Sequence, residues 1–512
     1  MLISSRLPSG SKLVCGRPNS SSVVETVQWT EKKPVKNATL SACRSSIAAF
    51  LILTSLTGAA FAADLDTWVQ SESRIATNKL LANISPAGTL PGTIVASPSR
   101  ANPDYYFHWI RDAGLVMDAV VTLHQGSANK EDQQRYAKLL FDYVDLSRRN
   151  QLTSNPSGGP ADGGLGEPKF NVDGSAFTGS WGRPQNDGPA IRSNSLIRFA
   201  NILLKQGRED YVRSRLYDSR LPAETVIKAD LEYVSHHWRE ASFDLWEETK
   251  GQHFYTRMVQ RKALIQGADL AERLGDGGAA SWYRSQASEI EKEIVKHWDG
   301  QIIRATRDGG DWKSSGLDTA IILGVLHGGL NDGFMSLTDD RVLSTVERLK
   351  NDFHGRYGIN GRDTDFDGKL LGTALGRYPE DKYTGYDSNG LGNPWFLLTN
   401  ALAEFYFKSA RHFQEEGQIQ ISATNERFFR SLPIRARLQL MSGQVYDSKT
   451  AMFREIIRSL REAGDAQLRR TKLHASSDGS LSEQMNRDSG YMQGANDLTW
   501  SYASMLTAIW AR

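Results

Sequence analysis

Cysteine is nearly absent from this chain of 512 residues, and its two cysteines, Cys15 and Cys43, both lie near the start. Residues 63–512 carry no thiol, which excludes disulfides and cysteine-ligated metals from that part of the chain. The ten histidines show no metal-binding spacing such as H-E-x-x-H. We therefore expect neither a metal nor a cofactor, and we expect a large core to supply the stability.

Two motifs resemble ligand loops but lack essential positions. Residues 363–368 (DTDFDG) look like the start of a calcium loop, yet the twelfth position is Ala374 and not the bidentate glutamate that such a site needs. Residues 164–169 (GLGEPK) suggest a phosphate loop, but they lack the Walker spacing and follow no strand pattern. We interpret the first as a solvated turn and reject the second.

The chain also lacks a strong charge of either sign. Its net charge is +2, and residues 1–63 hold seven basic and two acidic residues. The remainder therefore carries 54 basic and 57 acidic residues, a net charge of about −3. A nucleic-acid-binding surface needs a concentrated basic patch, so no nucleic-acid partner is expected. A neutral polymer or a small neutral molecule suits this balance better.

One apolar run stands out, at residues 45–63 (SSIAAFLILTSLTGAAFAA), and it follows several lysines and arginines. A basic flank, a short apolar core and Ala60-Phe61-Ala62 are typical of a secretory signal cleaved after Ala62. The run is short for a membrane span, so no stable membrane insertion is expected after processing. An N-terminal anchor or a buried helix is the alternative. We expect residues 1–62 to be a leader and signal segment, and the protein to be secreted, or periplasmic in a Gram-negative host.

Alternating strand patterns are scarce in the remainder, whereas helical periodicity recurs about a dozen times. The sequence predicts an all-α fold, a large ring of helices in one domain over residues 63–512, with a site built from loops at one end. The expected helices span about 65–83, 112–123, 130–149, 189–205, 224–238, 256–274, 280–298, 317–326, 340–352, 394–411, 425–442, 449–462 and 494–510.

Residues 243–254 (FDLWEETKGQHF) place three carboxylates, Asp244, Glu247 and Glu248, around Leu245 and Trp246. Since an indole and a leucine separate the acids, we expect at least one of them to lie against apolar surface. Burial of that kind raises a carboxyl pKa and keeps a proton available for general acid catalysis. A solvated cluster of charges at a helix end is the alternative reading.

A second carboxylate, Glu483, lies more than two hundred residues later, in a Gly-Ser-Leu-Ser-Glu-Gln segment. By itself it could be an ordinary polar loop residue. Other clusters in the sequence favour a functional role for Glu483. Aromatic side chains recur beside Arg/Asp pairs in 105–112, in 181–187 and between Arg377 and Trp395. Rings cover the C–H faces of sugars and such polar pairs match their hydroxyls. Each cluster alone could also be a core ion pair near a tryptophan.

Six motifs in order complete the pattern: NPDYYFHWIRD, GLGEPKFNVDGSAFTGSWGRPQNDGPA, FDLWEE, GRYPED, GNPWFL and DGSLSEQMNRDSGY with DLTWSYASMLTA. From about Leu65 onward the chain resembles the glucoamylases of glycoside hydrolase family 15, in particular yeast-type enzymes without a starch-binding domain. The resemblance implies an (α/α)6 barrel. It also implies inverting exo-hydrolysis of α-1,4-glucosidic bonds in starch, maltodextrins and maltose, with release of β-glucose.

The resemblance assigns the general acid to Glu247 and the general base to Glu483. The acid protonates the glycosidic oxygen while the base activates a water on the opposite face of the sugar. Inversion then requires the two carboxyl groups to lie roughly 6.5–9.5 Å apart, which leaves room for that water.

The resemblance further implies that Arg111, Asp112 and Arg377 hold hydroxyls of the terminal glucose. It places the Tyr105 ring near the developing oxocarbenium charge and Trp181 over the site, with a hydrogen bond near the acid. The full set of substrate-binding residues carried over in this way is Tyr105, Trp109, Arg111, Asp112, Trp181, Asp244, Leu245, Trp246, Glu248, Arg377, Asp381, Trp395 and Gln484.

Within that set, Asp244 and Glu248 match neighbours of the acid that bind the next sugar or tune the acid, and Gln484 matches a residue that steadies the base. Phe177 departs from the family pattern, because many members have tyrosine there. Two other functions stay open: the same mechanism on α-1,6 bonds or trehalose, and α-glucan binding without hydrolysis. We expect an α-glucan as the partner and a monomeric protein.

Overall fold

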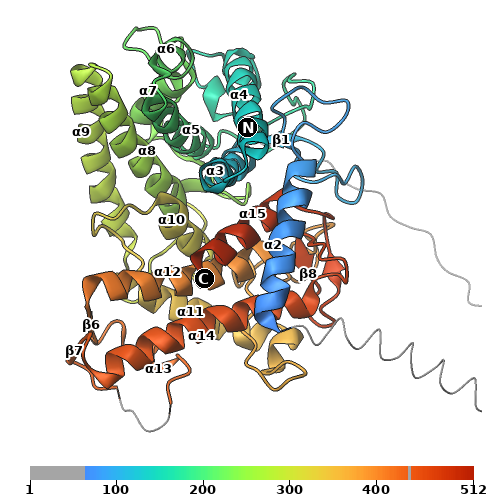
Figure 1. The fold of residues 1–512 in the computed structure, drawn as a ribbon, viewed down its shortest axis with the longest axis vertical. Helices are drawn as coiled ribbons and strands as arrows, with labels where there is room; N and C mark the ends of the chain where they lie inside the picture. Colours follow the sequence, from blue (N-terminus) through green and yellow to red (C-terminus); the bar gives the residue numbers. More distant parts are fainter. Residues whose placement is uncertain (1–63, 436–439) are drawn as a thin grey trace, which may run out of the picture. The chain divides into compact units, whose positions relative to one another are not determined.

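The computed structural model describes residues 64–435 and 440–512. A compact unit covers residues 63–512, and it is this unit that Figure 1 shows in colour. The predicted leader and signal segment, residues 1–62, lies outside the described residues. In the described part of the chain, no helix is both long and apolar enough to cross a membrane.

Twelve principal helices of the described residues alternate along the chain between two layers. The first layer contains α3 (Ile110–Gly126), α5 (Gly188–Lys205), α8 (Phe254–Arg273), α10 (Ala320–Gly328), α12 (Phe396–Glu416) and α15 (Thr499–Ala511). The second contains α2 (Leu65–Ala82), α4 (Lys130–Leu152), α7 (Val226–His237), α9 (Gly277–Ile294), α11 (Asp340–Arg356) and α14 (Ala451–His474).

The helices of the first layer form a closed inner ring. Each contacts the next in the order α3, α5, α8, α10, α12 and α15, and α15 returns to α3. Each outer helix packs chiefly on one inner partner: α2 on α15, α4 on α3, α7 on α5, α9 on α8, α11 on α10 and α14 on α12. Six inner and six outer helices constitute an (α/α)6 barrel, and the all-α prediction is confirmed (Figure 1).

The burial of each helix follows its layer. The inner α10 (AIILGVLHG) is almost wholly apolar, and α12 is buried on nearly every side. The outer α11 and α14 alternate buried apolar residues with charged ones, which produces one buried and one solvated face. The sequence pattern therefore distinguishes a helix covered all round from one covered on a single side.

Short elements connect the long helices. Two are brief α-helices, α6 (Glu209–Tyr211) and α13 (Glu426–Arg430), and four are 3₁₀ or π turns, η1 (Gly164–Gly166), η2 (Val212–Leu216), η3 (Val295–His297) and η4 (Gly358–Gly361). The strands are β1 (His108–Trp109), β2 (Lys169–Phe170), β3 (Ser242–Phe243), β4 (Lys250–His253), β5 (Thr306–Arg307), β6 (Gln418–Gln420), β7 (Val445–Asp447), β8 (Gln484–Met485) and β9 (Met492–Gln493). They pair antiparallel as β1-β2, β3-β4-β5, β6-β7 and β8-β9.

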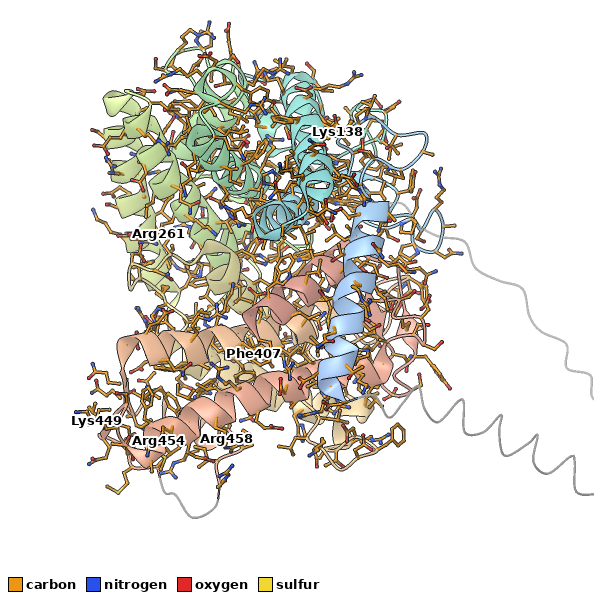
Figure 2. The ribbon with its side chains drawn as sticks, viewed as in Figure 1. Lys138, Arg261, Phe407, Lys449, Arg454 and Arg458 are labelled. Atoms are coloured by element: carbon orange, nitrogen blue, oxygen red, sulfur yellow. The ribbon has the colours of Figure 1, made fainter. Side chains whose placement is uncertain are left out.

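Two helix predictions are wrong in extent. The expected helix over 425–442 is only α13, Glu426–Arg430, because Pro433 cannot continue a helix. The helix expected to end near 462 instead continues to His474, passing through Gly464. A Cβ at Gly464 would lie 2.6 Å from the Phe407 ring of α12. That glycine lets two helices pack closely (Figure 2, where Phe407 is labelled), and it does not end α14.

The site-forming segments share one end of the barrel. Residues 105–109 precede α3, 181–187 precede α5, 243–248 precede α8, 377–395 precede α12 and 483–498 precede α15. Because inner and outer helices alternate, the six inner helices run in the same direction and their N-termini meet at one end. The loops that enter the inner helices therefore converge, as the sequence predicts.

Candidate active site

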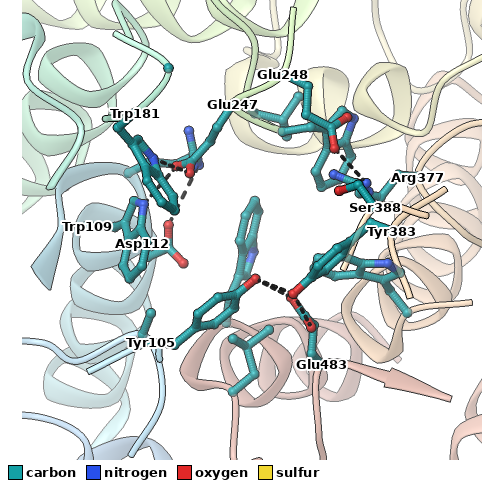
Figure 3. Close-up of a pocket in the computed structure, with 18 residues that line it drawn as sticks. Tyr105, Trp109, Asp112, Trp181, Glu247, Glu248, Arg377, Tyr383, Ser388 and Glu483 are labelled. Atoms are coloured by element: carbon teal, nitrogen blue, oxygen red, sulfur yellow. Dashed lines mark hydrogen bonds and ion pairs between the residues drawn. The ribbon is translucent and has the colours of Figure 1, made fainter. Parts of the chain in front are cut away.

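A cavity of about 300 Å³ lies where these loops converge (Figure 3). The side chains around it are aromatic and charged, with few aliphatic groups. Its lining consists of Ala96, Tyr105, Trp109, Arg111, Asp112, Trp181, Gly182, Leu245, Trp246, Glu247, Glu248, Arg377, Tyr383, Ser388, Trp395, Glu483, Leu498 and Trp500. Rings with a few convergent polar groups are typical of a small-molecule or sugar site.

Glu247 presents its carboxylate to the cavity from a turn between β3 and β4. Its Oε1 accepts hydrogen bonds from Trp109 Nε1 at 2.8 Å and from Arg111 Nη2 at 2.9 Å. Its Oε2 accepts from Trp181 Nε1 at 2.5 Å. Three donors from two other segments of the chain therefore fix both oxygens. The backbone of Glu247 is in the left-handed region, with φ of 69°, a conformation that non-glycine residues adopt rarely and often at functional sites.

Asp244 builds this turn and does not face the cavity. Its Oδ1 accepts from the backbone N–H groups of Glu248 at 2.9 Å and Thr249 at 3.0 Å, and its Oδ2 lies 3.1 Å from Lys313 Nζ. Burial opposes ionisation, but Lys313, His253 and these N–H groups hold the pKa of Asp244 below its ordinary value. Asp244 is therefore not an acid of this stretch with a raised pKa.

Glu483 faces the same cavity from the opposite side (Figure 3). It is fully buried, and its backbone is held on both sides: its N–H donates to the Ala495 carbonyl at 2.8 Å and its carbonyl accepts from Phe396 N–H at 3.3 Å. Its Oε1 accepts from the Tyr105 hydroxyl at 2.9 Å, and its Oε2 lies 3.5 Å from the Tyr383 hydroxyl. The residue therefore has a fixed backbone and two phenol neighbours.

Burial raises the pKa of Glu483 to about 8, while the Tyr105 hydrogen bond and the charge of Arg377 oppose that rise. A raised carboxyl pKa therefore occurs at Glu483, outside residues 243–254. Among the described residues no cation forms an ion pair with Glu483, whereas Lys313 lies 3.1 Å from Asp244.

Arg377 forms the third polar group of the wall. Its Nε and Nη2 bind the two oxygens of Asp381 at 2.9 and 2.6 Å, and Nη2 also donates to Glu248 Oε1 at 2.9 Å. Tyr378 donates its hydroxyl to the other oxygen of Glu248. Asp381 is buried behind Arg377 and fixes the plane of the guanidinium. Arg377 and Glu248 can then present hydrogen-bonding edges to a bound molecule.

Arg111 and Asp112 are adjacent at the start of α3, on the other side of the cavity. Arg111 Nη1 donates to Gln185 Oε1 at 2.9 Å and to Asp187 Oδ2 at 3.1 Å, so its guanidinium is clamped from the α5 side. The Asp112 carboxylate lies 3.7 Å from Arg111 Nε. Burial raises the pKa of Asp112 to about 6, against the opposing charge of Arg111.

The cavity brings together twelve of the fifteen residues singled out from the sequence. The three that do not line it, Asp244, Asp381 and Gln484, lie buried directly behind lining residues. Gln484 is in β8 and its Oε1 accepts from Asn393 Nδ2 at 2.8 Å, so it holds the backbone next to Glu483. The sequence reasoning missed Ala96, Gly182, Tyr383, Ser388, Leu498 and Trp500 on the wall. Tyr383 follows Asp381 by two residues, a signal that could have found it.

Comparisons with known proteins show the family of the chain. Residues 74–510 match the glycosyl hydrolases family 15. The chain belongs to this family. The glucoamylase of Blastobotrys adeninivorans is 41% identical over 468 residues, covering 88% of this chain and 73% of that protein. Glucoamylase 1 of Rhizopus oryzae is 37% identical over 454 residues, covering 88% and 71%.

Solved structures of the family share the barrel. The glucoamylase of Saccharomycopsis fibuligera superposes with a TM-score of 0.78 at 34% identity, covering 88% of this chain and 95% of that one. A family 15 glucoamylase of Hypocrea jecorina also gives 0.78, at 33% identity, covering 88% and 72%. The family 15 barrel is therefore present, with the cavity at the end where the inner helices begin.

Proposed function

We propose that this family 15 enzyme has glucoamylase activity, the release of single glucose units from the ends of α-1,4-linked glucans. The observation that carries the proposal is the pair of glutamates, Glu247 and Glu483, on opposite walls of one cavity (Figure 3). The relatives named above, each a glucoamylase by name, support the same activity.

In the proposed mechanism Glu247 is the general acid and Glu483 the general base. Glu247 gives its proton to the glycosidic oxygen, and Trp109 and Trp181 hold its carboxyl in position through their N–H groups. Glu483 removes a proton from a water that attacks C1 from the other side. Positioned proton transfer of this kind contributes about 10²–10⁴-fold each. Since the two carboxyls lie across the cavity, the product is expected to be inverted, β-glucose.

The other wall residues are proposed to bind the terminal sugar. Arg111 and Arg377 are held rigidly by buried carboxylates, which is the arrangement that recognises hydroxyls in fixed positions, and Asp112 lies beside Arg111. The Tyr105 ring lies beside Glu483, where positive charge develops at C1. Trp246 and Trp395, whose ring centroids are 6.0 Å apart, offer apolar faces to the sugar.

For the chain as a whole we propose one catalytic domain over residues 63–512, acting as a monomer on an α-glucan after export. The basic and apolar pattern of residues 32–62 supports export. One relative, 32% identical, is named an intracellular, sporulation-specific glucoamylase of Saccharomyces cerevisiae, so membership of the family does not decide the location. Comparing the N-terminus of protein from the culture medium with that of cell-bound protein tests the proposal.

The deciding experiment follows the first glucose released from maltotriose by NMR. We expect β-glucose to appear first and the α-anomer to grow only by mutarotation. Initial α-glucose would overturn the inverting mechanism. Turnover of maltose, isomaltose and trehalose in parallel separates α-1,4 hydrolysis from its linkage alternatives, and a complete lack of glucose release with intact maltose binding would support a binding protein.

A further inference from the structure

Lys169 lies out of solvent at the back of the active site, and no step of the proposed mechanism uses it. The residue is in β2 opposite Trp109 of β1 and is 2% exposed. Its Nζ lies 3.3 Å from the ring centroid of Trp181, 4.0 Å from that of Phe177, 4.4 Å from that of Trp109 and 4.5 Å from that of Phe107. An ammonium group therefore occupies a cage of four aromatic rings.

The four rings also contact one another in a closed circuit. Phe107 packs edge-on against Trp109 at 6.0 Å and against Phe177 at 5.3 Å, measured between ring centroids. Trp181 packs edge-on against Phe177 at 5.9 Å and against Trp109 at 6.0 Å. Rings in such contacts present their electron-rich faces inward, and the cation–π attraction to a desolvated ammonium is then strong.

Two of the four rings are the indoles that hold Glu247. Trp109 and Trp181 donate to different oxygens of its carboxylate, at 2.8 and 2.5 Å. A cation against an indole face draws electron density from the ring and strengthens its N–H as a donor. The charge of Lys169 therefore reaches Glu247 through both indoles, although Lys169 and Glu247 form no ion pair.

The loop that carries two of the rings is fixed independently of the lysine. Arg183 donates to the carbonyls of Gly179 at 2.9 Å and Phe177 at 3.2 Å, and its Nε lies 3.1 Å from both oxygens of Glu167. These contacts hold the loop backbone, so replacement of Lys169 by an uncharged side chain of similar length leaves the backbone in place and removes only the charge that the rings surround. Burial lowers the pKa of Lys169 to about 8, so the ammonium form predominates below that pH.

We propose that Lys169 is a positioning residue for the hydrolytic reaction: its caged ammonium orients the Trp109 and Trp181 indoles and sets the proton affinity of Glu247 through them. The proposal rests on the function of Glu247 as the general acid. The proposal predicts the direction in which the pH profile moves when the charge is lost. Removing the positive charge makes Glu247 release its proton less readily, so the high-pH limit of kcat moves to higher pH.

Lys169→Met tests the charge, because methionine has a similar length and no cation. We expect kcat on maltose to fall roughly tenfold or more through misplaced indoles. We also expect the alkaline limb of the kcat profile to move up by at least about 0.5 pH unit, as loss of a nearby desolvated charge requires. Lys169→Arg keeps the charge, so its alkaline limb should stay near that of the wild type although kcat falls.

Lys228→Met is the matched control, since Lys228 is equally buried but pairs with Asp276 at 2.9 Å, away from the cavity. It should lower the unfolding temperature and leave the pH profile unchanged. A folded Lys169→Met enzyme with wild-type kcat and an unmoved alkaline limb overturns the proposal. If that variant does not fold, Phe177→Leu removes one ring of the cage. The alkaline limb of its kcat profile should then move up as well, by a smaller amount. Wild-type hydrolysis of maltose, measured alongside, tests the function separately.

Discussion

The Tyr105 hydroxyl lies 2.9 Å from Oε1 of Glu483 and 2.8 Å from the hydroxyl of Tyr383. Tyr105 can donate only one proton, so Tyr383 completes the pair by donating to Tyr105 or by reaching Oε2 of Glu483 at 3.5 Å. Both phenols favour the charged carboxylate, against the burial that raises the pKa of Glu483 to about 8. The proposed base therefore depends on hydroxyl donors, because no cation among residues 64–435 and 440–512 forms an ion pair with it.

Tyr105→Phe removes the closer donor. The pKa of Glu483 should then rise further above about 8, and a smaller fraction of the carboxyl is ionised at any given pH. We expect the acid limb of kcat/KM, measured on maltose, to move to higher pH, and the rate at neutral pH to fall roughly tenfold or more.

Tyr217→Phe is the control for that experiment. Tyr217 is also buried and donates to a carboxylate, Asp276, at 2.9 Å, but it lies outside the cavity. Its removal should affect stability without moving the limb. An acid limb that stays in place in Tyr105→Phe would show that another group controls it.

Substitution of each proposed catalytic carboxyl by its amide separates the two roles. Glu247→Gln and Glu483→Gln should each reduce maltose turnover by about 10³-fold or more and leave maltose binding nearly intact. α-Glucosyl fluoride needs little protonation of its leaving group, so Glu247→Gln should recover most of its activity on this substrate. Glu483→Gln should not, because the attacking water still needs a base.

The comparison of the two substrates also decides the opposite assignment. Recovery on the fluoride by Glu483→Gln, and not by Glu247→Gln, would make Glu483 the acid. Glu291→Gln is a suitable control, since Glu291 pairs with Arg261 at 2.7 Å away from the cavity and its variant should keep both activities.

Trp181→Phe keeps a ring in the loop and removes one donor to Glu247. The Trp181 N–H is the contact to Oε2 at 2.5 Å, so the carboxyl of Glu247 loses its orientation on the side facing the loop. We expect kcat on maltose to fall by about 10-fold or more, with a smaller change in KM. Trp312→Phe, at an exposed tryptophan outside the cavity lining, is the control, and equal kcat values in the two variants would contradict the role.

The sequence predicts the helices and the cavity well because both rest on local patterns. Apolar periodicity marks a buried helix face, and aromatic residues beside Arg/Asp pairs mark the loops before the inner helices. The sequence predicts less well those features that depend on contacts between residues distant in the chain. The helix predicted to end near residue 462 continues through Gly464, because this glycine packs against Phe407 of another helix.

The pKa shifts of the buried carboxyls are also difficult to predict from local sequence. Whether the pKa of a buried carboxyl is raised or lowered depends on the balance between its burial and the cations and hydrogen-bond donors around it, and these partners come from distant segments. Lys313 reaches Asp244 from about seventy residues away, and Arg111 reaches Glu247 from more than a hundred. No local pattern around residues 243–254 shows those partners. The four-ring cage of Lys169 is invisible for the same reason, since its rings come from two separate loops.

Arg377→Lys should mainly weaken substrate binding. Arg377 uses a two-pronged contact to Asp381 and a third bond to Glu248, and a lysine cannot reproduce that planar fork. We expect KM for maltose to rise roughly tenfold or more, as the loss of charged hydrogen bonds implies. Arg341→Lys is matched, because Arg341 makes the same fork to Asp339 on an outer helix, and its kinetics should not change. An unaltered KM in Arg377→Lys would remove Arg377 from sugar binding.

Glu72 of α2 makes the stability of the enzyme depend on pH. It is 1% exposed, its Oε1 has no hydrogen-bond partner among the described residues, and burial together with Asp478 raises its pKa to about 8. Between pH 4.5 and 8 the folded state holds a proton that the unfolded state has released, so the free energy of unfolding decreases as pH rises through this window. Glu72→Gln carries no such proton. The variant should match the wild type below pH 4.5 and be more stable, by at least about 1 kcal/mol, above pH 8.

Glu455 supplies the opposite case within the same chain. Arg458 contacts it at 2.7 Å, and the hydrogen bond from that guanidinium lowers the pKa of Glu455 to about 2. Its stabilisation is present above pH 4.5 and is lost as pH falls through about 2, so Glu455→Gln should destabilise the protein at neutral pH. Urea unfolding of both variants and the wild type at pH 4.5, 6.5 and 8.5 measures the two effects. A Glu72→Gln stability that keeps a constant offset from the wild type across these three pH values would mean that Glu72 is already ionised in the folded protein.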